Sequence, residues 1–457
     1  MPKKIFFIGI GGKGLNGIAK ICLEKKYQVC GVDKKKSPET VDLYKNGAQI
    51  FYEHKETNVK SDTDIVVYSS IINEECPEII AAKKMGIRII KRAEFLKELT
   101  VKDFRISISG SHGKSTTTAL LGLSMINSGI DPTIFGGAYT KELSGYNHLG
   151  KSIYSVVEAC EYDRSFFHLI GDATIITSIE KSHMEYYKDE DDMVGAFKEF
   201  VDLHPENSII VANGDDIKIR QVTANSECHV VYFGFNESND YVIKDLVKDK
   251  NSSTFSVYNS GQKIITDLKI NIPGDYNILN FASCVAFCDV LDIPIFGIRE
   301  TAKYFSGVGR RFEVHKAKTG QIFIDDFAHH PTQVKNLYKG IKQFYPDKKT
   351  YAVFEPRQYN LMNSFAKEYG SAFKGFDEVI LTDIVPALGD TDNDIKSINS
   401  KDIAESIERY SQTKVHLIKT YSEISNYLKQ KTRSGNVITT IGAGDIYKVR
   451  EEFNKSV

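Results

Sequence analysis

Short apolar runs alternate along the whole chain with longer segments in which apolar residues recur at helical spacing. In the first part, the apolar runs cover residues 3–10, 27–33, 64–70 and 87–90, and the helical segments cover 15–26 and 91–100. This alternation is typical of parallel strands whose crossover helices cover the faces of a sheet. The pattern therefore predicts a Rossmann-like unit at the start of the chain.

Two further units follow the first. Their apolar runs cover residues 105–110, 152–160, 173–179 and 208–216, and then 321–327, 351–356, 377–384, 414–419 and 436–442. Residues 241–273 alternate around turn residues, which predicts an antiparallel insert, and a helix is predicted over 277–291. We therefore expect an α/β protein of three domains, with boundaries near residues 100 and 312. These are a Rossmann-like domain over 1–100, a central P-loop ATPase-type domain with a mostly parallel sheet over 101–312, and a Rossmann-like domain over 313–457.

The composition excludes several classes of protein. With 457 residues, 41% of them hydrophobic and 26% charged, the chain is a globular protein too long for a single core. A formal net charge of −1 argues against non-specific nucleic-acid binding as the main task. No apolar stretch resembles a signal peptide or approaches the roughly 20 residues of a membrane helix. The seven cysteines lack metal-binding spacing, so we expect reduced thiols and a cytoplasmic location. From the net charge and the apolar stretches, we expect neither nucleic-acid nor membrane partners.

The stretch Ser107–Thr118, "SISGSHGKSTTT", combines the end of an apolar run with glycines, a lysine and hydroxyls. A strand that ends in a glycine turn exposes backbone N–H groups, and the following helix adds its positive end, so the stretch predicts a phosphate site. Lys114 can reach the outer phosphates of a nucleotide, and Ser115 can offer its oxygen to Mg²⁺. The usual pattern GxxxxGKS/T has glycine where this chain has Ile108. The nucleotide-binding candidates of this variant loop are Gly110, Ser111, His112, Gly113, Lys114, Ser115 and Thr116.

A second glycine-rich turn follows the first predicted strand. It contains Gly9, Gly11, Gly12 and Gly14, and Asp33 ends the second strand. Small residues at a helix N-terminus let the backbone approach a diphosphate, and an acid after the second strand can bind a ribose hydroxyl. The turn favours a nucleotide-like diphosphate without choosing the nucleotide, so an NAD-dependent oxidoreductase is one alternative.

Further polar residues follow other predicted strands. Glu158 ends an apolar run and His183 follows the next one, so both are candidates for holding Mg²⁺ near the phosphate loop. A buried carboxylate at Glu158 needs a partner. Weaker candidates, each at a predicted turn or domain junction, are Asn277, Asn280, Arg310, Arg311, Asp325, Asp326 and His329.

Together these motifs resemble the Mur ligase family. The segments "GIGGKGLNGIA", "GSHGKSTTT", "EACEYDRSF", "RRFE", "DDFAHHP" and "GAGDIYKV" occur in the order that the family has, across essentially the whole chain. The resemblance implies an ATP-dependent amide ligase of peptidoglycan precursor synthesis. Its N-terminal domain would bind a UDP-sugar, its central domain ATP and Mg²⁺, and its C-terminal domain the incoming amine. In the branch with the most similar motifs, L-alanine is joined to the carboxylate of UDP-N-acetylmuramate through an acyl phosphate.

The same resemblance implies roles for individual residues. Those in catalysis would be Lys114, His183, His329 and Arg311, with His329 beside the incoming amino group. Those on Mg²⁺ would be Ser115 and Glu158, with His183 at a second ion. Those on ATP outside the loop would be Asn277 and Asn280 at the adenine, and Arg310 or Arg311 with Asp325 or Asp326. Those on the substrates would be Gly9, Gly11, Gly12, Gly14, Asp33 and Arg357.

The chain also departs from the family pattern. Ser178 and Ser182 replace an asparagine and an aspartate that precede the histidine. Gln358 and Leu361 replace two arginines that serve the amino-acid carboxylate, and Arg357 stands where a histidine is usual. Two alternatives therefore stay open. One is a ligase that attaches a recycled tripeptide to the same sugar nucleotide, and the other is a nucleotide-gated binding protein with little activity. We expect a monomer or a homodimer.

Overall fold

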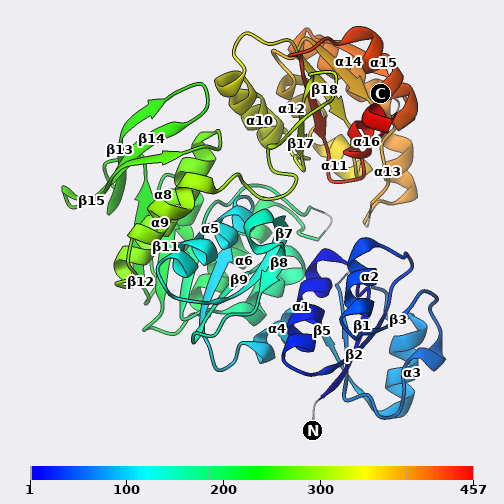
Figure 1. Cartoon of the computed structure of the whole chain (residues 1–457), viewed down its shortest axis with the longest axis vertical. Coiled ribbons are helices and arrows are strands. Elements are labelled where there is room, and N and C mark those ends of the chain that lie inside the picture. Colours follow the sequence, from blue (N-terminus) through cyan, green and yellow to red (C-terminus); the bar gives the residue numbers. More distant parts are fainter. Residues whose placement is uncertain (1–2, 71, 185, 388, 456–457) are drawn as a thin grey trace.

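The structure is a computed structural model that describes residues 3–70, 72–184, 186–387 and 389–455. Over these residues, three consecutive stretches of chain each build a β-sheet with helices packed on it (Figure 1). We call them the N-terminal part (sheet residues 4–91), the central part (104–270) and the C-terminal part (313–441). In Figure 1 the N-terminal part lies at the lower right, the central part at the left and the C-terminal part at the top.

The N-terminal sheet has the order β3-β2-β1-β4-β5, and all neighbouring strands are parallel. Its strands are β1 (Lys4–Ile8), β2 (Gln28–Val32), β3 (Gln49–Phe51), β4 (Ile65–Tyr68) and β5 (Arg88–Lys91). Its helices are α1 (Lys13–Glu24), α2 (Pro38–Lys45), η1 (Glu56–Asn58), α3 (Pro77–Met85) and α4 (Arg92–Leu99). The strand order reverses between β1 and β4, which confirms the predicted doubly wound sheet and leaves a crevice at the carboxyl end of β1.

The central sheet has the order β15-β14-β13-β12-β11-β10-β6-β9-β7-β8. Its strands are β6 (Phe104–Ser109), β7 (Thr133–Thr140), β8 (Gly145–His148), β9 (Tyr154–Glu158), β10 (Ala173–Ile176), β11 (Ile209–Asn213), β12 (His229–Gly234), β13 (Tyr241–Lys248), β14 (Ser253–Asn259) and β15 (Gln262–Ile270). Its helices are α5 (Lys114–Asn127), η2 (Lys141–Leu143), η3 (Tyr162–Leu169), α6 (Glu190–Asp202), α7 (Ile217–Thr223), α8 (Asp275–Val290) and α9 (Phe296–Tyr304). The middle of the sheet is parallel, and β13–β15 form the predicted antiparallel insert.

The C-terminal sheet has the order β16-β17-β21-β18-β19-β20 and is parallel except for β16. Its strands are β16 (Glu313–Lys316), β17 (Ile322–Asp326), β18 (Thr350–Phe354), β19 (Glu378–Leu381), β20 (Lys414–Leu417) and β21 (Val437–Ile441). Its helices are α10 (Pro331–Phe344), α11 (Tyr359–Ser364), α12 (Ala366–Ala372), α13 (Asp392–Ser397), α14 (Ser400–Ser411), α15 (Tyr421–Lys431) and α16 (Lys448–Lys455).

The packing of the central part fixes the position of the site. Helix α8 is apolar on nearly all sides, and it is buried against the central sheet beside α5. Cys284 and Cys288 of α8 are fully buried. Strands β6, β9, β10 and β11 run parallel, so their carboxyl ends meet at one edge, where α5 begins. Within the described ranges, every helix is too short or too polar to span a lipid bilayer.

Candidate active site

The predicted phosphate loop connects β6 to α5. Gly110 has φ +130° and Gly113 has φ +86°, a region that side chains rarely adopt. A Cβ at Gly110 would press on the Thr177 hydroxyl and lie 2.9 Å from the Ser178 nitrogen. Both glycines are therefore required by the backbone and by the close approach of the segment after β10.

One detail of the predicted loop is corrected by the structure. The N–H of Ser111 donates to the carbonyl of Ser178 (2.8 Å), and the N–H of His112 donates to its side-chain oxygen (3.0 Å). These two donors are already used within the protein, so the phosphate contacts expected of this loop fall to the first turn of α5 and to Lys114.

Lys114 is held by a buried carboxylate. Its Nζ lies 2.7 Å from the carboxylate of Glu161, and it also donates to the carbonyls of Gly110 and Ser111. Burial acts to lower the pKa of Lys114, but the Glu161 charge outweighs it and the pKa is raised. Burial acts to raise the pKa of Glu161, but Lys114 and then His183 hold it below its usual value. Lys114 is therefore a cation, and Glu161 is its carboxylate partner.

A cavity of about 820 Å³ opens beside the loop and is bounded by the central and C-terminal parts. The predicted residues that line it are Ser111, His112, Gly113, Lys114, Ser115, Thr116, Glu158, Asn280, Arg311 and Asp326. Gly274 and Tyr276, from the start of α8, and Thr332, Gln333 and Asn336, from α10, line it as well. This space combines a phosphate loop, carboxylates and an arginine, as a triphosphate with a divalent cation requires.

Two oxygen donors for a cation lie at the cavity. Ser115 is the second residue of α5, and Glu158 ends β9 in register with Ile108 of β6. The Glu158 side chain is half-buried, and its carboxylate accepts the N–H of Gly137 (2.9 Å). His183 lies away from this pair, with its Nε2 3.6 Å from the Glu161 carboxylate, and it is outside the described cavity lining.

The two junction arginines have different surroundings. Arg310 pairs with Asp325 (3.1 Å) and donates to the carbonyl of Gly442, whereas Arg311 lines the cavity with Asp326. Asp326 accepts the N–H groups of Phe312 and Ala328, and burial raises its pKa. Of the alternatives predicted at this junction, Arg311 and Asp326 reach the cavity, while Arg310 and Asp325 satisfy each other.

His329 stands in the turn between β17 and α10. Burial lowers its pKa to about 3, so the ring is neutral near pH 7. Its Nδ1 lies 3.1 Å from the carbonyl of Phe327, which fixes the proton on Nδ1 and leaves the lone pair on Nε2. Tyr369 donates to the His329 carbonyl and holds the turn. His329 can therefore accept a hydrogen bond through Nε2.

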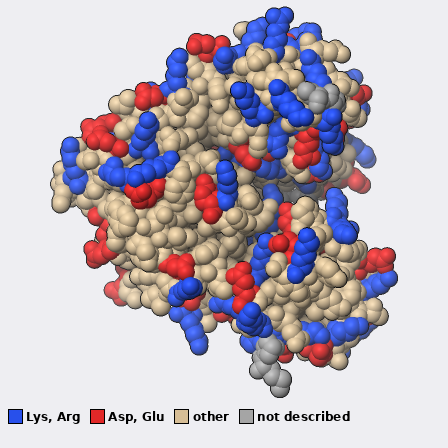
Figure 2. Space-filling model, in the orientation of Figure 1, with Lys and Arg blue, Asp and Glu red and all other residues tan. Residues whose placement is uncertain are grey.

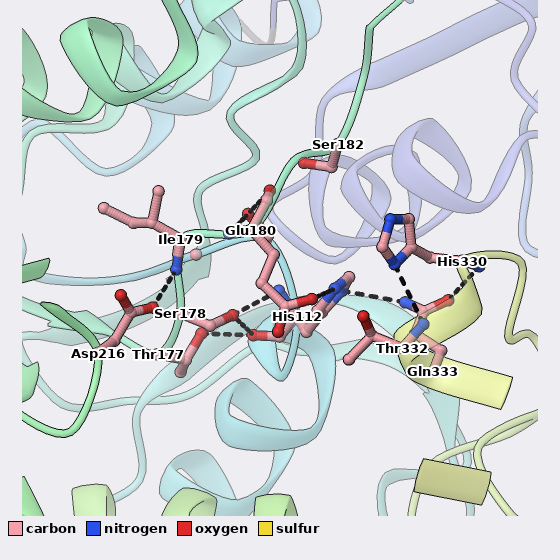
Figure 3. Close-up of polar contacts among 12 residues, drawn as sticks. His112, Thr177, Ser178, Ile179, Glu180, Ser182, Asp216, His330, Thr332 and Gln333 are labelled. Atoms are coloured by element: carbon pink, nitrogen blue, oxygen red, sulfur yellow. Dashed lines mark hydrogen bonds and ion pairs between the residues drawn. The ribbon is translucent and has the colours of Figure 1, made fainter. Parts of the chain in front are cut away.

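A hydrogen-bond network joins the phosphate loop to this turn (Figure 3). The His112 ring lies between the Glu180 carboxylate (Nε2 to Oε2, 3.2 Å) and the Gln333 amide (Nδ1 to Nε2, 3.0 Å). Gln333 Oε1 accepts the N–H groups of His329 (2.9 Å) and His330 (3.1 Å). The loop of the central part is thus fastened directly to the first turn of α10.

Figure 2 shows a hollow between the N-terminal and C-terminal parts, with basic and acidic side chains at its edge. Asp33 accepts the N–H of Gly11 (2.9 Å), so it holds the turn in shape, besides any contact with a ligand. Lys13 opens α1, and its Nζ lies 5.3 Å from the ring centre of Phe327. Arg310 and Arg311 each lie 5.2 Å from the same ring. Three cations therefore gather around one aromatic side chain.

Comparison with known proteins identifies the family. Models of this family match in three successive stretches: "Mur ligase family, catalytic domain" at residues 4–103, "Mur ligase middle domain" at 108–288 and "Mur ligase, glutamate ligase domain" at 310–444. The UDP-N-acetylmuramate–L-alanine ligase of Clostridium acetobutylicum is 37% identical over 454 residues, which cover 99% of this chain and 98% of that one. The chain belongs to the Mur ligase family.

Solved structures share the fold of this Mur ligase. UDP-N-acetylmuramate-alanine ligase from Thermotoga maritima has a TM-score of 0.83 at 24% identity, with 99% of this chain and 98% of that one covered. A murein peptide ligase from Psychrobacter arcticus has a TM-score of 0.73 at 19% identity, with 99% and 98% covered. These likenesses confirm the three-domain α/β architecture that the sequence predicts.

Several predicted residues of the ligase lie apart from the cavity. Asn277 donates to the carbonyl of Pro273 (2.7 Å) at the start of α8, so its amide supports the helix. Arg357 lies beside Gly444 and pairs with Val385 through the backbone, within the C-terminal part. The N-terminal Gly9, Gly12 and Gly14 lie at the start of α1, where Gly14 packs against Arg92.

Sequence reasoning missed three residues of the ligase site. The sequence motifs assign no role to Glu161, Glu180 or Gln333. A signal for Gln333 existed, since glutamine three residues after a helix N-cap often completes a capping box. The contacts of these residues with Lys114 and His112 are long-range, and only the fold brings them together.

Proposed function

We propose that this chain is an ATP-dependent ligase that joins L-alanine to the carboxylate of UDP-N-acetylmuramate in peptidoglycan precursor synthesis. Relatives named UDP-N-acetylmuramate–L-alanine ligase are 34–37% identical over 99% of the chain. One structural observation carries the proposal: the cavity has the phosphate loop on one side and Arg311 with α10 on the other. A triphosphate in it would point its outer phosphates at the junction of the three parts. Because the reaction uses ATP and a nucleotide sugar, we expect it in the cytoplasm.

The chemistry follows from the poor leaving group of a carboxylate. Transfer of the γ-phosphoryl group from ATP to the carboxylate breaks the bond between the β- and γ-phosphates and gives ADP and an acyl phosphate. The amine of L-alanine then adds to the acyl carbon, loses a proton, and displaces inorganic phosphate to leave an amide. Lys114 and Arg311 would offset the negative charge that moves during phosphoryl transfer. His329 would orient the incoming amine by accepting a hydrogen bond through Nε2, which carries the lone pair.

The residues at the cavity fit Mg²⁺. Ser115 and Glu158 supply a hydroxyl and a carboxylate, which are the oxygen ligands this ion prefers, and the ion would neutralise phosphate charge. The surroundings of His183 fit less well, because Glu161 there is already paired with Lys114 and the neighbouring Cys160 is a soft ligand. We therefore assign Mg²⁺ to Ser115 and Glu158.

The remaining roles follow from position. Asn280 and Tyr276 would lie along the nucleoside of ATP, since they line the end of the cavity formed by α8. The glycine turn at Gly9–Gly12 would take the UDP diphosphate at the N-terminus of α1. Domain closure would exclude water from the acyl phosphate.

The test is formation of ADP by the purified protein with UDP-N-acetylmuramate, ATP, Mg²⁺ and L-alanine. ADP release that requires L-alanine supports the proposal, and Lys114→Ala should abolish it. The tripeptide alternative rests on Gln358 and Leu361, which replace two arginines expected at the amino-acid carboxylate. Release with the tripeptide but not with L-alanine would favour that alternative. Release with no amine, or preferential binding of NAD, would refute the ligase assignment.

A further inference from the structure

The Gln333 side chain contacts both the phosphate loop and the turn that carries His329. It is the third residue of α10, it lines the cavity, and it touches the phosphate loop through His112. Its other end holds the backbone of His329 and His330. Figure 3 shows these contacts as one connected path from Glu180 through His112 to the start of α10.

The orientation of the Gln333 amide is determined by its neighbours. The oxygen accepts two backbone N–H groups, which can only donate, so the NH₂ group must point to His112. His112 Nδ1 must then be an acceptor, since two donors cannot face each other at 3.0 Å. The proton of the ring therefore lies on Nε2, where it donates to the Glu180 carboxylate.

We propose that Gln333 is a positioning residue that holds His112 as the neutral Nε2–H tautomer, and thereby ties the phosphate loop to the turn that carries His329. This inference rests on the proposed function, because it couples the ATP site to the amine site. The Gln333 amide has one orientation: its oxygen faces the start of α10, and its NH₂ group faces His112 of the phosphate loop. A substitution that replaces only the NH₂ donor should weaken the contact with His112. It should leave in place the hydrogen bonds from the backbone of His329 and His330.

The charges around the ring show why the tautomer needs to be held. Glu180 attracts a proton to His112, whereas His330, whose ring centre is 6.0 Å away, and nearby His329 are kept neutral by burial. The Glu180 carboxylate holds an N–H on Nε2, whether or not the ring carries a second proton on Nδ1. The Gln333 NH₂ group opposes the second proton, because a cationic ring would place an N–H against it. The pair Glu180 and Gln333 thus defines one protonation state.

Gln333→Glu tests the proposal, because it keeps an oxygen for the two backbone N–H groups and replaces the NH₂ donor by an acceptor. We expect His112 to become doubly protonated near pH 7, with ¹⁵N chemical shifts of a cation in histidine-labelled protein. The wild type should show the Nε2–H tautomer. Unchanged His112 shifts in Gln333→Glu would overturn the proposal.

Gln333→Leu removes both contacts, and Gln343→Leu is the matched control. Gln343 lies on the same helix and lines the same cavity, but its amide donates to Asp249, Ser252 and Ser253 instead. We expect Gln333→Leu to lower kcat about tenfold, to raise KM for L-alanine and to leave His112 in mixed tautomers. Gln343→Leu should leave the His112 spectrum unchanged. An equal spectral change in both variants, or unaltered kinetics in Gln333→Leu, would show that Gln333 acts only as a helix residue.

The two proposals fail in different ways. The His112 spectrum is read without any substrate, so it reports on the tautomer even if the ligase assignment is wrong. If the wild type released no ADP with any amine but showed the held tautomer, the proposed function would fall and so would the coupling it requires. If the wild type is active and Gln333→Glu retains the His112 tautomer and the wild-type kinetics, only the role of Gln333 is refuted.

Discussion

Replacing Glu161 with glutamine removes the buried negative charge that pairs with Lys114 of the phosphate loop. The Glu161 side chain is 0% exposed and the Lys114 side chain 11% exposed, and their charged atoms lie 2.7 Å apart. Glutamine keeps the shape and a hydrogen-bond acceptor for Lys114 but removes the negative charge. The Lys114 cation would then be buried with Glu158 as the next carboxylate that acts on it.

The magnitude follows from the asymmetry of buried ion pairs. Removing one partner of such a pair typically costs about 3–5 kcal/mol, because the other charge stays desolvated without compensation. Since glutamine can still accept from Lys114, we expect the lower end, about 3 kcal/mol. The double variant Lys114→Met/Glu161→Leu removes both charges and should be more stable than Glu161→Gln alone.

The assay is native-state hydrogen exchange of the α5 amides, because a multidomain protein does not unfold in a single two-state step. The opening free energy of α5 should drop by about 3 kcal/mol in Glu161→Gln and partly recover in the double variant. The pKa of Glu161 is lowered in the folded state. Its stabilisation is therefore present above the ordinary glutamate pKa and is lost as pH falls through the lowered value. A loss below about 1 kcal/mol, or no recovery in the double variant, would refute the assignment of a buried ion pair.

Three other changes probe the site. Gly110→Ala forces a Cβ onto Thr177 in a backbone region unsuited to alanine, so ADP release should fall about 100-fold, and normal release would contradict the loop geometry. Lys13→Met removes one of the three cations around Phe327. We expect it to weaken binding of UDP-N-acetylmuramate about tenfold and to make the binding less dependent on salt, as measured by calorimetry. The control Lys25→Met, at the other end of α1, should leave this binding unchanged. Activity should saturate with MgATP alone, and a cooperative requirement for additional free Mg²⁺ would show a second ion near His183.

The parts of the site that the sequence predicted are local in the chain. The phosphate loop needs a strand end, two glycines with positive φ and a helix start, and all three lie within residues 104–114. The same holds for the antiparallel insert, whose alternating pattern is visible without any knowledge of its neighbours. The predicted apolar runs omit β3, β7, β8, β12 and β16. Strand β3 spans only three residues, and the residues Gly145–His148 of β8 are half-buried at the sheet edge.

The parts that the sequence could not predict depend on contacts between distant residues. Glu158 and Glu161 are the same residue type and cannot be told apart in the sequence. In the structure, the register of β9 places Glu158 at the cavity, and the following turn places Glu161 beside Lys114. The N–H groups of Ser111 and His112 look available for phosphate until the segment after β10 is in place. Pairing of Arg310 with Asp325 likewise distinguishes two adjacent arginines only in three dimensions.

The departures at Ser178 and Ser182 gain a physical reason from this arrangement. Ser178 accepts two N–H groups of the loop, through its carbonyl and its hydroxyl, and Ser182 donates to the Glu161 carboxylate at 3.3 Å. An acid in place of Ser182 would put a second negative charge beside Glu161 and would need another cation to offset it. With serine there, the single positive charge of Lys114 balances the single negative charge of Glu161. The Glu161 carboxylate beside His183 is thus already paired with Lys114, which favours Ser115 and Glu158 over the surroundings of His183 as the proposed Mg²⁺ ligands.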